Sequence, residues 1–264
     1  MQQRVITALV ALAIFIPILL LGGWALELLM ALIGVVSMFE LLKMRKQPLV
    51  SFLSLAGLFC MLVILLPSNY LFFMNQEIDK FLVFYAGVVL MLIHMVRRPH
   101  QINVEDVAAV SFFAIYLGMG YHYLLMIRDM GLSYLFLGLI IIFANDSFAY
   151  LVGRAVGKHK LAPEVSPNKT IEGSIGGIVG AYTLSTIFLL LTPSLNISAG
   201  QNIILVLILA LAGQMGDLIE STMKRYYQVK DSGHILPGHG GLVDRFDNLL
   251  IVMPLFYFVL SYLN

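Results

Sequence analysis

Long apolar runs separated by short polar segments dominate the chain. Spanning backbone must satisfy its own hydrogen bonds, so only helices or a closed barrel cross a bilayer, and continuous apolar runs lack the alternation of barrel strands. A spanning helix needs ~20 apolar residues. The pattern therefore predicts an all-α, polytopic membrane protein with about nine transmembrane helices, at about 5–23, 24–43, 52–73, 81–96, 105–126, 130–152, 173–192, 199–221 and 246–263.

The basic residues fall on one side of these predicted spans. If the N-terminus lies in the cytoplasm, only Lys80 and Arg128 of the 16 Lys and Arg residues fall on the far side. Cytoplasmic loops carry the excess of Lys and Arg, so we expect an N-in, C-out topology. The composition, 60% hydrophobic and 12% charged, fits an integral, multi-pass protein, which we expect in a bacterial cytoplasmic membrane. We expect the lipid bilayer and no nucleic acid as a partner.

The two parts of the chain differ in where their polar residues lie. Residues 1–104 hold spans with few internal polar groups, which predicts N-terminal scaffold helices facing lipid. Residues 105–264 carry polar groups within or beside the spans, which predicts the catalytic region. Two cytoplasmic loops of this region, 153–172 and 224–245, are long enough to form structure.

Acidic residues gather at the predicted cytoplasmic ends of the last spans. Asp217 is followed at spacings of three, four and seven by Glu220, Ser221 and Lys224, so the four share one helical face. Asp244 and Asp247 likewise share a face where the last span begins, and Asp146 lies near the cytoplasmic end of the sixth span. Carboxylates converging from different helices suit hard cations, which prefer oxygen ligands. Interfacial ion pairs of Asp217 and Asp244 with Lys224 and Arg245 are the alternative.

The loop before the last span combines glycines with basic residues. Pro237, Gly238, His239, Gly240 and Gly241 form a breaker cluster, and glycine turns can bring backbone N–H groups close to an anion. Lys224, Arg225, Lys230 and Arg245 flank it and offer charge-assisted hydrogen bonds to phosphate. Each feature alone also fits an ordinary turn or a topology signal. Together they predict a phosphate-binding loop.

The loop after the sixth span offers a second phosphate contact. Gly153 to Lys158 resembles a phosphate loop, but it has one residue too few between its glycines, and His159 stands where Ser or Thr must bind magnesium. That interpretation is rejected. Ser166, Lys169 and Thr170 present a cation and hydroxyls ahead of a helix and remain candidates for phosphate binding. Thr170 can equally be the cap of that helix. Glycines 173, 176, 177 and 180 predict close helix packing.

The stretch from Ser221 to Asp247 resembles the signature of the phosphatidate cytidylyltransferases, also called CDP-diglyceride synthases. That signature has the form S-x-apolar-K-R-x4-K-D-x-small-x2-apolar-P-x-H-G-G-apolar-x-D-R-apolar-D, and the chain matches it without a departure. The upstream segments N-D-S-x-A-Y and S-P-x-K-T are similar to the family as well. The resemblance covers residues 144–250, whereas the first 100 residues match only in being hydrophobic.

The resemblance implies cytidylyl transfer from CTP to phosphatidic acid, giving CDP-diacylglycerol and pyrophosphate. It implies Mg²⁺, a second, monovalent cation (K⁺) and a homodimer. The implied metal ligands are Asp146, Asp217, Asp244 and Asp247. Substrate contacts are expected from Ser166, Lys169, Thr170, Ser221, Gly240 and Gly241. Catalytic roles are expected for Asp217, Lys224, Arg225, Lys230, Asp231, His239, Asp244, Arg245 and Asp247.

Two other functions fit parts of the sequence. A cation- or proton-coupled transporter would use intramembrane acids, but transporters usually consist of related halves with interrupted helices, and no internal repeat is visible. A CTP-dependent enzyme acting on another lipid would share the nucleotide chemistry. A measurement of ion flux distinguishes the transporter from an enzyme. A comparison of lipid acceptors distinguishes a phosphatidate cytidylyltransferase from a CTP-dependent enzyme that acts on another lipid.

Overall fold

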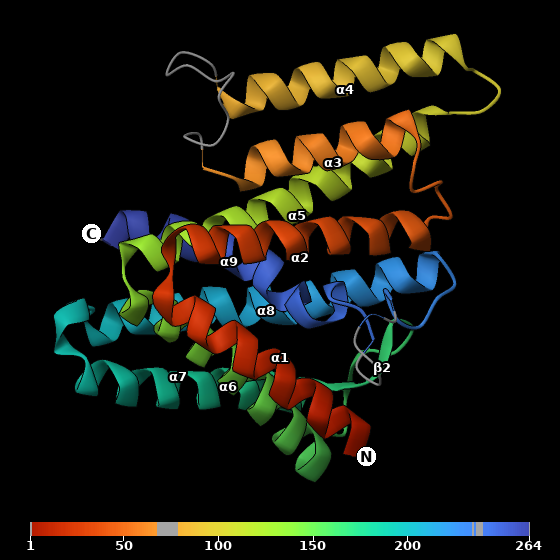
Figure 1. Cartoon of the computed structure of the whole chain (residues 1–264). Coiled ribbons are helices and arrows are strands. Elements are labelled where there is room, and N and C mark those ends of the chain that lie inside the picture. The colour runs from red at the N-terminus through yellow and green to blue at the C-terminus, as the bar shows by residue number, and fades with distance from the viewer. Residues whose placement is uncertain (1, 68–78, 234, 236–239, 264) are drawn as a thin grey trace. The chain divides into compact units, whose positions relative to one another are not determined.

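The computed structural model describes residues 2–67, 79–233, 235 and 240–263. The predicted His239, together with Pro237 and Gly238, lies outside the described residues. Helices occupy most of the chain, and one lies at each position where the sequence predicts a span (Figure 1). Six of them are long and apolar enough to cross a membrane: α2 (Gly23–Met44), α4 (Lys80–Arg97), α5 (Val104–Met130), α6 (Leu132–Val156), α7 (Ile171–Leu191) and α8 (Ala199–Tyr226). The prediction of a helical, polytopic membrane protein is confirmed at this level.

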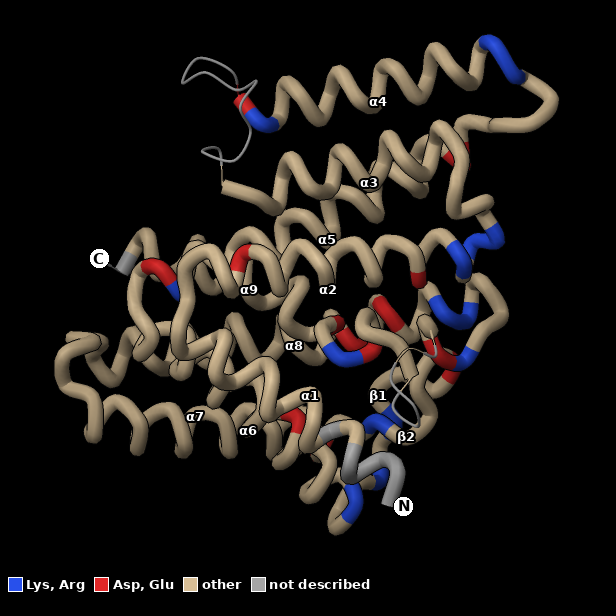
Figure 2. Tube along the Cα trace, in the orientation of Figure 1, with Lys and Arg blue, Asp and Glu red and all other residues tan. Residues whose placement is uncertain are grey.

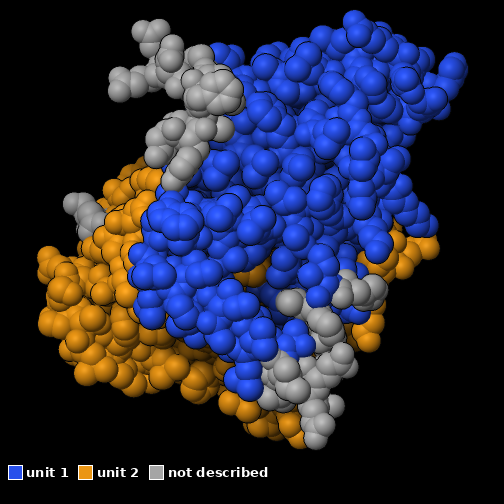
Figure 3. Space-filling view, viewed as in Figure 1, with its two compact units in different colours: residues 1–125, 231–245 blue, residues 126–230, 246–264 orange. Residues whose placement is uncertain are grey.

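The chain divides into two compact units (Figure 3). Unit 1 consists of residues 1–125 and 231–245, and unit 2 consists of residues 126–230 and 246–264. The sequence was divided at residue 104 according to where its polar groups lie. That residues 1–104 form a scaffold and residues 105–264 the catalytic region stays a prediction.

In unit 1, α3 (Phe52–Leu65) packs closely against α2, α4 and α5. A Cβ on Gly34 of α2 would lie 3.0 Å from Leu65, one on Gly87 of α4 would lie 2.3 Å from the Cys60 sulfur, and one on Gly118 of α5 would lie 2.9 Å from Ile64. Because glycine has no side chain, α2, α4 and α5 can pack with their backbones in direct contact with α3 at these positions. The predicted third span runs to residue 73, but α3 ends at Leu65, because Leu66 precedes Pro67 and adopts an extended backbone.

The first two helices, α1 (Gln2–Leu21) and α2, are separate as predicted. Gly22 and Gly23 have φ angles of 68° and 56°. This left-handed backbone is easily adopted by glycine and breaks the helix. The predicted boundary at these two residues is confirmed.

In unit 2, α6 carries α7 on one face, and α9 (Val243–Leu263) packs near both α6 and α8. A Cβ on Gly176 would lie 2.6 Å from Val152, and one on Gly180 would lie 2.2 Å from Phe148. Close α6–α7 packing through these glycines is confirmed. On the other side, a Cβ on Gly138 would lie 2.7 Å from Phe256 of α9. A short 3-10 helix, η2 (Pro193–Leu195), links α7 to α8.

A small antiparallel hairpin interrupts the helical architecture. Strands β1 (Lys160–Ala162) and β2 (Ser166–Thr170) pair with Lys160 opposite Thr170 and Ala162 opposite Ser166. The sequence predicted structure in the 153–172 loop but no strands. Thr170 ends β2 and caps α7, because its side chain accepts a 3.1 Å hydrogen bond from the Gly173 N–H. The hairpin is thus anchored directly to a helix start.

Candidate functional site

Charged residues are sparse along the helices and lie mainly near helix ends and in the segments that connect them (Figure 2). In unit 2, charged and polar residues come together from α6, β2, α7, α8 and the start of α9. They form a continuous polar network, which we call the unit 2 cluster: Asn145, Asp146, Lys169, Ser174, Gln214, Asp217, Ser221, Asp247 and Asn248.

Asp217 occupies the centre of this cluster. Its Oδ2 lies 2.5 Å from Lys169 Nζ on β2, and its Oδ1 accepts a 3.3 Å hydrogen bond from Ser221 one turn later. The Asp217 side chain is 37% exposed, so the carboxylate is open to a ligand. Glu220, which is buried, forms its ion pair with Lys224. Asp217, Glu220, Ser221 and Lys224 therefore share one helical face, as predicted. Asp217 pairs with Lys169, and Lys224 pairs with Glu220.

Asp146 is the second carboxylate of the cluster. Its Oδ2 accepts a 2.7 Å hydrogen bond from Asn248 Nδ2 of α9, and its Oδ1 lies 3.4 Å from Asn145 Nδ2. Asp247 is half-buried next to Asn248, whose backbone N–H donates to Asp247 Oδ1 at 2.8 Å. Asp146, Asp217 and Asp247 are near enough to repel one another electrostatically, and Lys169 and Lys224 counter part of that repulsion. Three helices thus bring negative charge to one place.

A buried amide layer supports these carboxylates. Gln214 Nε2 donates to Asn145 Oδ1 at 2.9 Å and to the Ser174 carbonyl at 3.2 Å, and Gln214 Oε1 accepts from the Ser174 hydroxyl. Asn145 is only 1% exposed. Sequence reasoning assigned no role to Gln214, Ser174 or Asn248. The available signal was a polar residue near an acid: Gln214 is three residues before Asp217, and Asn248 directly follows Asp247.

The donor chemistry of the cluster fits a hard cation. Three carboxylates are present, and the buried Asn248 Oδ1 has no hydrogen-bond partner among the described residues. Oxygen donors of this kind bind magnesium, which keeps several of its own waters. Nevertheless, within the described ranges no group of three or more His, Cys, Asp or Glu residues is gathered closely enough to hold a metal directly. Any such ion would be contacted partly through water or after side-chain movement.

The end of α8 presents two of the predicted phosphate-binding cations to one cavity. The helix ends with hydrogen bonds from Gln228 N to Arg225 O and from Val229 N to Lys224 O, with Gln228 at φ 57°. This is the Schellman arrangement that closes helices. The cavity beside it has a volume of about 430 Å³ and is lined by Arg225, Gln228, Val229 and Lys230.

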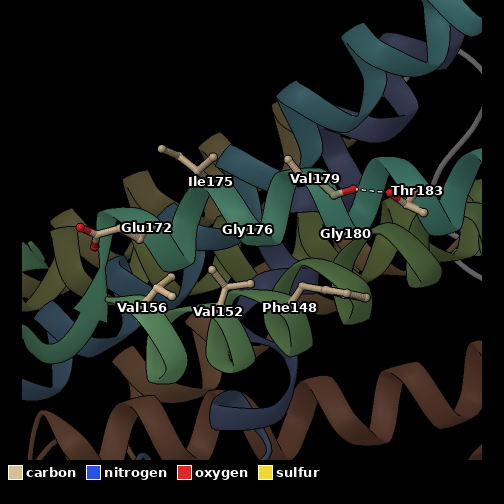
Figure 4. Close-up of a pocket in the computed structure, with 9 residues that line it drawn as sticks. All are labelled: Phe148, Val152, Val156, Glu172, Ile175, Gly176, Val179, Gly180 and Thr183. Atoms are coloured by element: carbon tan, nitrogen blue, oxygen red, sulfur yellow. Dashed lines mark hydrogen bonds between the residues drawn. The ribbon is translucent and has the colours of Figure 1, made fainter. Parts of the chain in front are cut away.

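A second hollow of unit 2 is different in character. It has a volume of about 440 Å³ and lies along α6 and α7, lined by Phe148, Val152 and Val156 of α6 and by Ile175, Gly176, Val179 and Gly180 of α7 (Figure 4). Its remaining lining residues are Glu172 and Thr183. None of these nine residues is basic, so this groove does not suit a triphosphate.

The described glycines of the loop, Gly240 and Gly241, belong to unit 1, where the Gly241 N–H donates to a carboxylate. Asp244 Oδ2 accepts from Gly241 N at 2.8 Å and from Ser232 N and Oγ, both at 2.9 Å. Gly240 has φ 83°, a backbone that favours glycine. Asp231 and Arg245 are exposed, and Ser166 of unit 2 is half-buried. The structure brings Asp244 together with Ser232, Gly240 and Gly241. Its predicted convergence with the acids of unit 2 stays a prediction.

Comparisons with known proteins point in one direction. The model of the Cytidylyltransferase family matches residues 2–263. A phosphatidate cytidylyltransferase of Bacillus subtilis is 44% identical over 264 residues, which cover 99% of this chain and 98% of the relative. Phosphatidate cytidylyltransferases of Staphylococcus saprophyticus and Staphylococcus haemolyticus are 38% and 37% identical, each over 97% of both chains. The likeness therefore extends through the N-terminal region, which the sequence motifs did not cover.

Proposed function

This chain belongs to the cytidylyltransferase family, and we propose that its unit 2 cluster holds reacting groups of the activity its relatives carry. The enzyme transfers the cytidylyl group of CTP to phosphatidic acid, giving CDP-diacylglycerol and pyrophosphate. An oxygen of the lipid phosphate bonds to the α-phosphorus of CTP, and the bond from that phosphorus to the bridging oxygen breaks. The electron pair leaves with pyrophosphate.

The observation that carries the assignment is the meeting of acids from α6, α8 and α9 with a cation from β2. Asp217 is paired with Lys169, and Asp146 and Asp247 lie within electrostatic reach. Both substrates are strongly anionic, so the reaction needs positive charge to bring them together. Carboxylates alone would repel the substrates. This cluster therefore serves the reaction by holding cations.

We assign Mg²⁺ to Asp146, Asp217 and Asp247, with Asp244 added on the basis of the sequence pattern. A bound magnesium ion would neutralise the triphosphate and orient its pyrophosphate. The orphaned amide oxygen of Asn248 is a further donor, suited to Mg²⁺ or to the monovalent K⁺ that the resemblance implies. Lys169 limits the repulsion among the acids and is close enough to contact a phosphate of a substrate held there.

Arg225 and Lys230 are proposed to bind phosphates in the cavity that they line. Lys224, His239 and Arg245 are assigned the same role from the signature alone, as are Ser166, Ser221, Gly240 and Gly241 in substrate contacts. No general base is needed, because a lipid phosphate monoester is already largely ionised near neutral pH.

The location of the polar helix ends suits the two substrates. CTP is water-soluble, whereas phosphatidic acid keeps its acyl chains in the bilayer, so a site at a membrane interface can take both. We propose that the interface is cytoplasmic, in a bacterial cytoplasmic membrane, on the grounds of the basic residues there. A homodimer is proposed from the resemblance alone.

Purified protein in lipid nanodiscs tests this function. Release of pyrophosphate from CTP should require both phosphatidic acid and Mg²⁺, and equal molar amounts of CDP-diacylglycerol should form. Diacylglycerol or phosphatidylglycerol in place of phosphatidic acid should give no product. Cation flux in sealed vesicles without CTP turnover would favour the transporter, and a preference for another lipid acceptor would change the substrate.

A further inference from the structure

A buried glutamate of α2, Glu40, is hydrogen-bonded to the segment that precedes α9 in unit 1, which we call the signature loop (described residues 231–233, 235 and 240–243). Glu40 is only 4% exposed, and both of its carboxylate oxygens accept hydrogen bonds from residues about two hundred positions later. Oε1 accepts from Leu242 N at 3.0 Å, and Oε2 accepts from Val243 N at 3.0 Å and from Ser232 Oγ at 3.3 Å. The partners of Glu40 are thus the loop's own backbone and a hydroxyl.

The loop is shaped closely around this side chain. A Cβ on Gly233 would lie 2.4 Å from Glu40 Oε1, and a Cβ on Gly241 would lie 2.5 Å from Glu40 Oε2. Real Cβ atoms do not come this near to an oxygen, so a methyl group at either position would force the Glu40 carboxylate to move. An ionisable residue within a membrane span is expensive, and here the cost is met by three donors that belong to one loop.

Glu40 is linked to Asp244 through Ser232. The Ser232 hydroxyl lies 3.3 Å from Glu40 Oε2 and 2.9 Å from Asp244 Oδ2. A hydroxyl has one hydrogen, so it can donate fully to only one of the two carboxylates at a time. Glu40 also repels Asp244 electrostatically. The donors between the two acids therefore fix the distance and the direction of the Asp244 carboxylate.

We propose that Glu40 is a positioning residue for cytidylyl transfer: it holds the 240–243 backbone so that Asp244 is presented in one orientation. The proposal rests on the proposed function, in which Asp244 belongs to the reacting site. It adds to the catalytic apparatus a residue of the N-terminal helices, outside the 221–247 signature.

Substitution by glutamine removes this arrangement at almost constant volume. An amide offers one acceptor oxygen and one NH₂ donor. Either orientation of the amide would turn the NH₂ group toward the N–H of Leu242 or of Val243. Glu40→Gln should therefore release one side of the loop while leaving the packing of α2 nearly unchanged. Ser37→Ala is the matched control, because Ser37 lies one turn earlier on α2 and its buried hydroxyl bonds Tyr121 of α5 at 2.8 Å.

The experiment measures kcat, KM for CTP and loop mobility in the full-length protein in nanodiscs. Glu40→Gln should lower kcat about tenfold or more, the effect of one lost hydrogen bond to a charged group, with KM for CTP changed less than twofold. Ser37→Ala should keep kcat within twofold. Gly233→Ala, which would place a Cβ 2.4 Å from Glu40 Oε1 at a position with no assigned substrate contact, should give the same fall in kcat as Glu40→Gln and remains informative if that variant does not fold.

A spin label reports on the loop independently of activity. The sole cysteine, Cys60, is buried, so Cys60→Ala provides a background for a label at Ile235→Cys, where the native side chain is 55% exposed. The label should become more mobile with Glu40→Gln and not with Ser37→Ala. A looser loop with unchanged kcat would make Glu40 a structural anchor only and overturn the proposal, as would equal kcat in Glu40→Gln and Ser37→Ala. A wild type that makes no CDP-diacylglycerol would instead overturn the proposed function.

Discussion

Lys169 Nζ lies 2.5 Å from Asp217 Oδ2, and this ion pair joins strand β2 to helix α8 within unit 2. The same lysine is 3.5 Å from the Gln214 carbonyl one turn earlier on α8. Two stretches that the sequence suggested separately as phosphate-binding and metal-binding are thus parts of one cluster. The next residue, Thr170, caps α7, which fixes this end of the hairpin to the start of that helix.

Replacing the half-buried Lys169 should impair catalysis. Lys169→Met leaves Asp217 facing Asp146 and Asp247 without that cation, so kcat/KM for CTP should fall on the order of tenfold or more. Lys169→Arg keeps the charge and should retain more activity. Lys160→Met, on exposed β1 of the same hairpin, is the control. Equal kinetics for Lys169→Met and Lys160→Met would show that the ion pair is only structural.

Asn248 should affect the Mg²⁺ requirement of the enzyme because it hydrogen-bonds Asp146. Asn248→Ala removes the 2.7 Å donor to Asp146 Oδ2 and the orphaned amide oxygen, so a higher Mg²⁺ concentration, by about threefold to tenfold, should be needed for half-maximal rate. Asn202→Ala is a matched loss of a buried asparagine on α8, where Asn202 bonds Thr186 at 3.0 Å. The two variants should lose comparable stability. An unchanged Mg²⁺ requirement in Asn248→Ala would separate Asn248 from the cation site.

Thr170 should contribute to stability through its cap. Thr170→Val keeps the shape but loses the acceptor for the Gly173 N–H, which should cost about 1 kcal/mol of unfolding free energy. Thr170→Ser keeps the hydroxyl and should cost less. Thermal unfolding followed by circular dichroism in detergent measures both. If the valine variant were as stable as the serine variant, the cap would contribute nothing measurable.

The α6–α7 contact should not tolerate a methyl group at Gly180. A Cβ there would lie 2.2 Å from Phe148, whereas one on Gly200 of α8 would meet nothing within 4 Å. Gly180→Ala should therefore lower the unfolding free energy by about 1–3 kcal/mol. Gly200→Ala should be neutral or slightly stabilising, because alanine favours helix. Equal stability of the two variants would mean that the helices separate without cost.

Local patterns in the sequence were sufficient to predict several parts of the structure. The length of the apolar runs located the helices, and the spacing of Asp217, Glu220, Ser221 and Lys224 correctly placed them on one face, as the Asp217–Ser221 and Glu220–Lys224 pairs confirm. The close packing at the α7 glycines and the helix cap at Thr170 could also be predicted from the sequence. Each of these features depends on residues within one or two turns.

Features that depend on distant partners could not be predicted in this way. Which lysine pairs with Asp217 is decided by the path of the hairpin, and a two-strand hairpin of three and five residues leaves little periodicity to detect. Glu40 lies in an apolar run of α2, and nothing nearby indicates that Leu242 and Val243 are its donors. The glycines of that loop suggested an anion site, and the anions that the structure shows there are the side chains of Glu40 and Asp244.

The most direct measurement is CDP-diacylglycerol formation from CTP and phosphatidic acid by Asp217→Asn and Asp244→Asn in nanodiscs at matched protein amounts. The substitutions preserve size and remove the charge that would hold a cation. The wild type should turn over in the presence of Mg²⁺, and both variants should insert normally and fall at least about a hundredfold in kcat, the scale of lost electrostatic stabilisation of a reacting group. Near-normal turnover in either variant would contradict the assignment of that aspartate to the cation site.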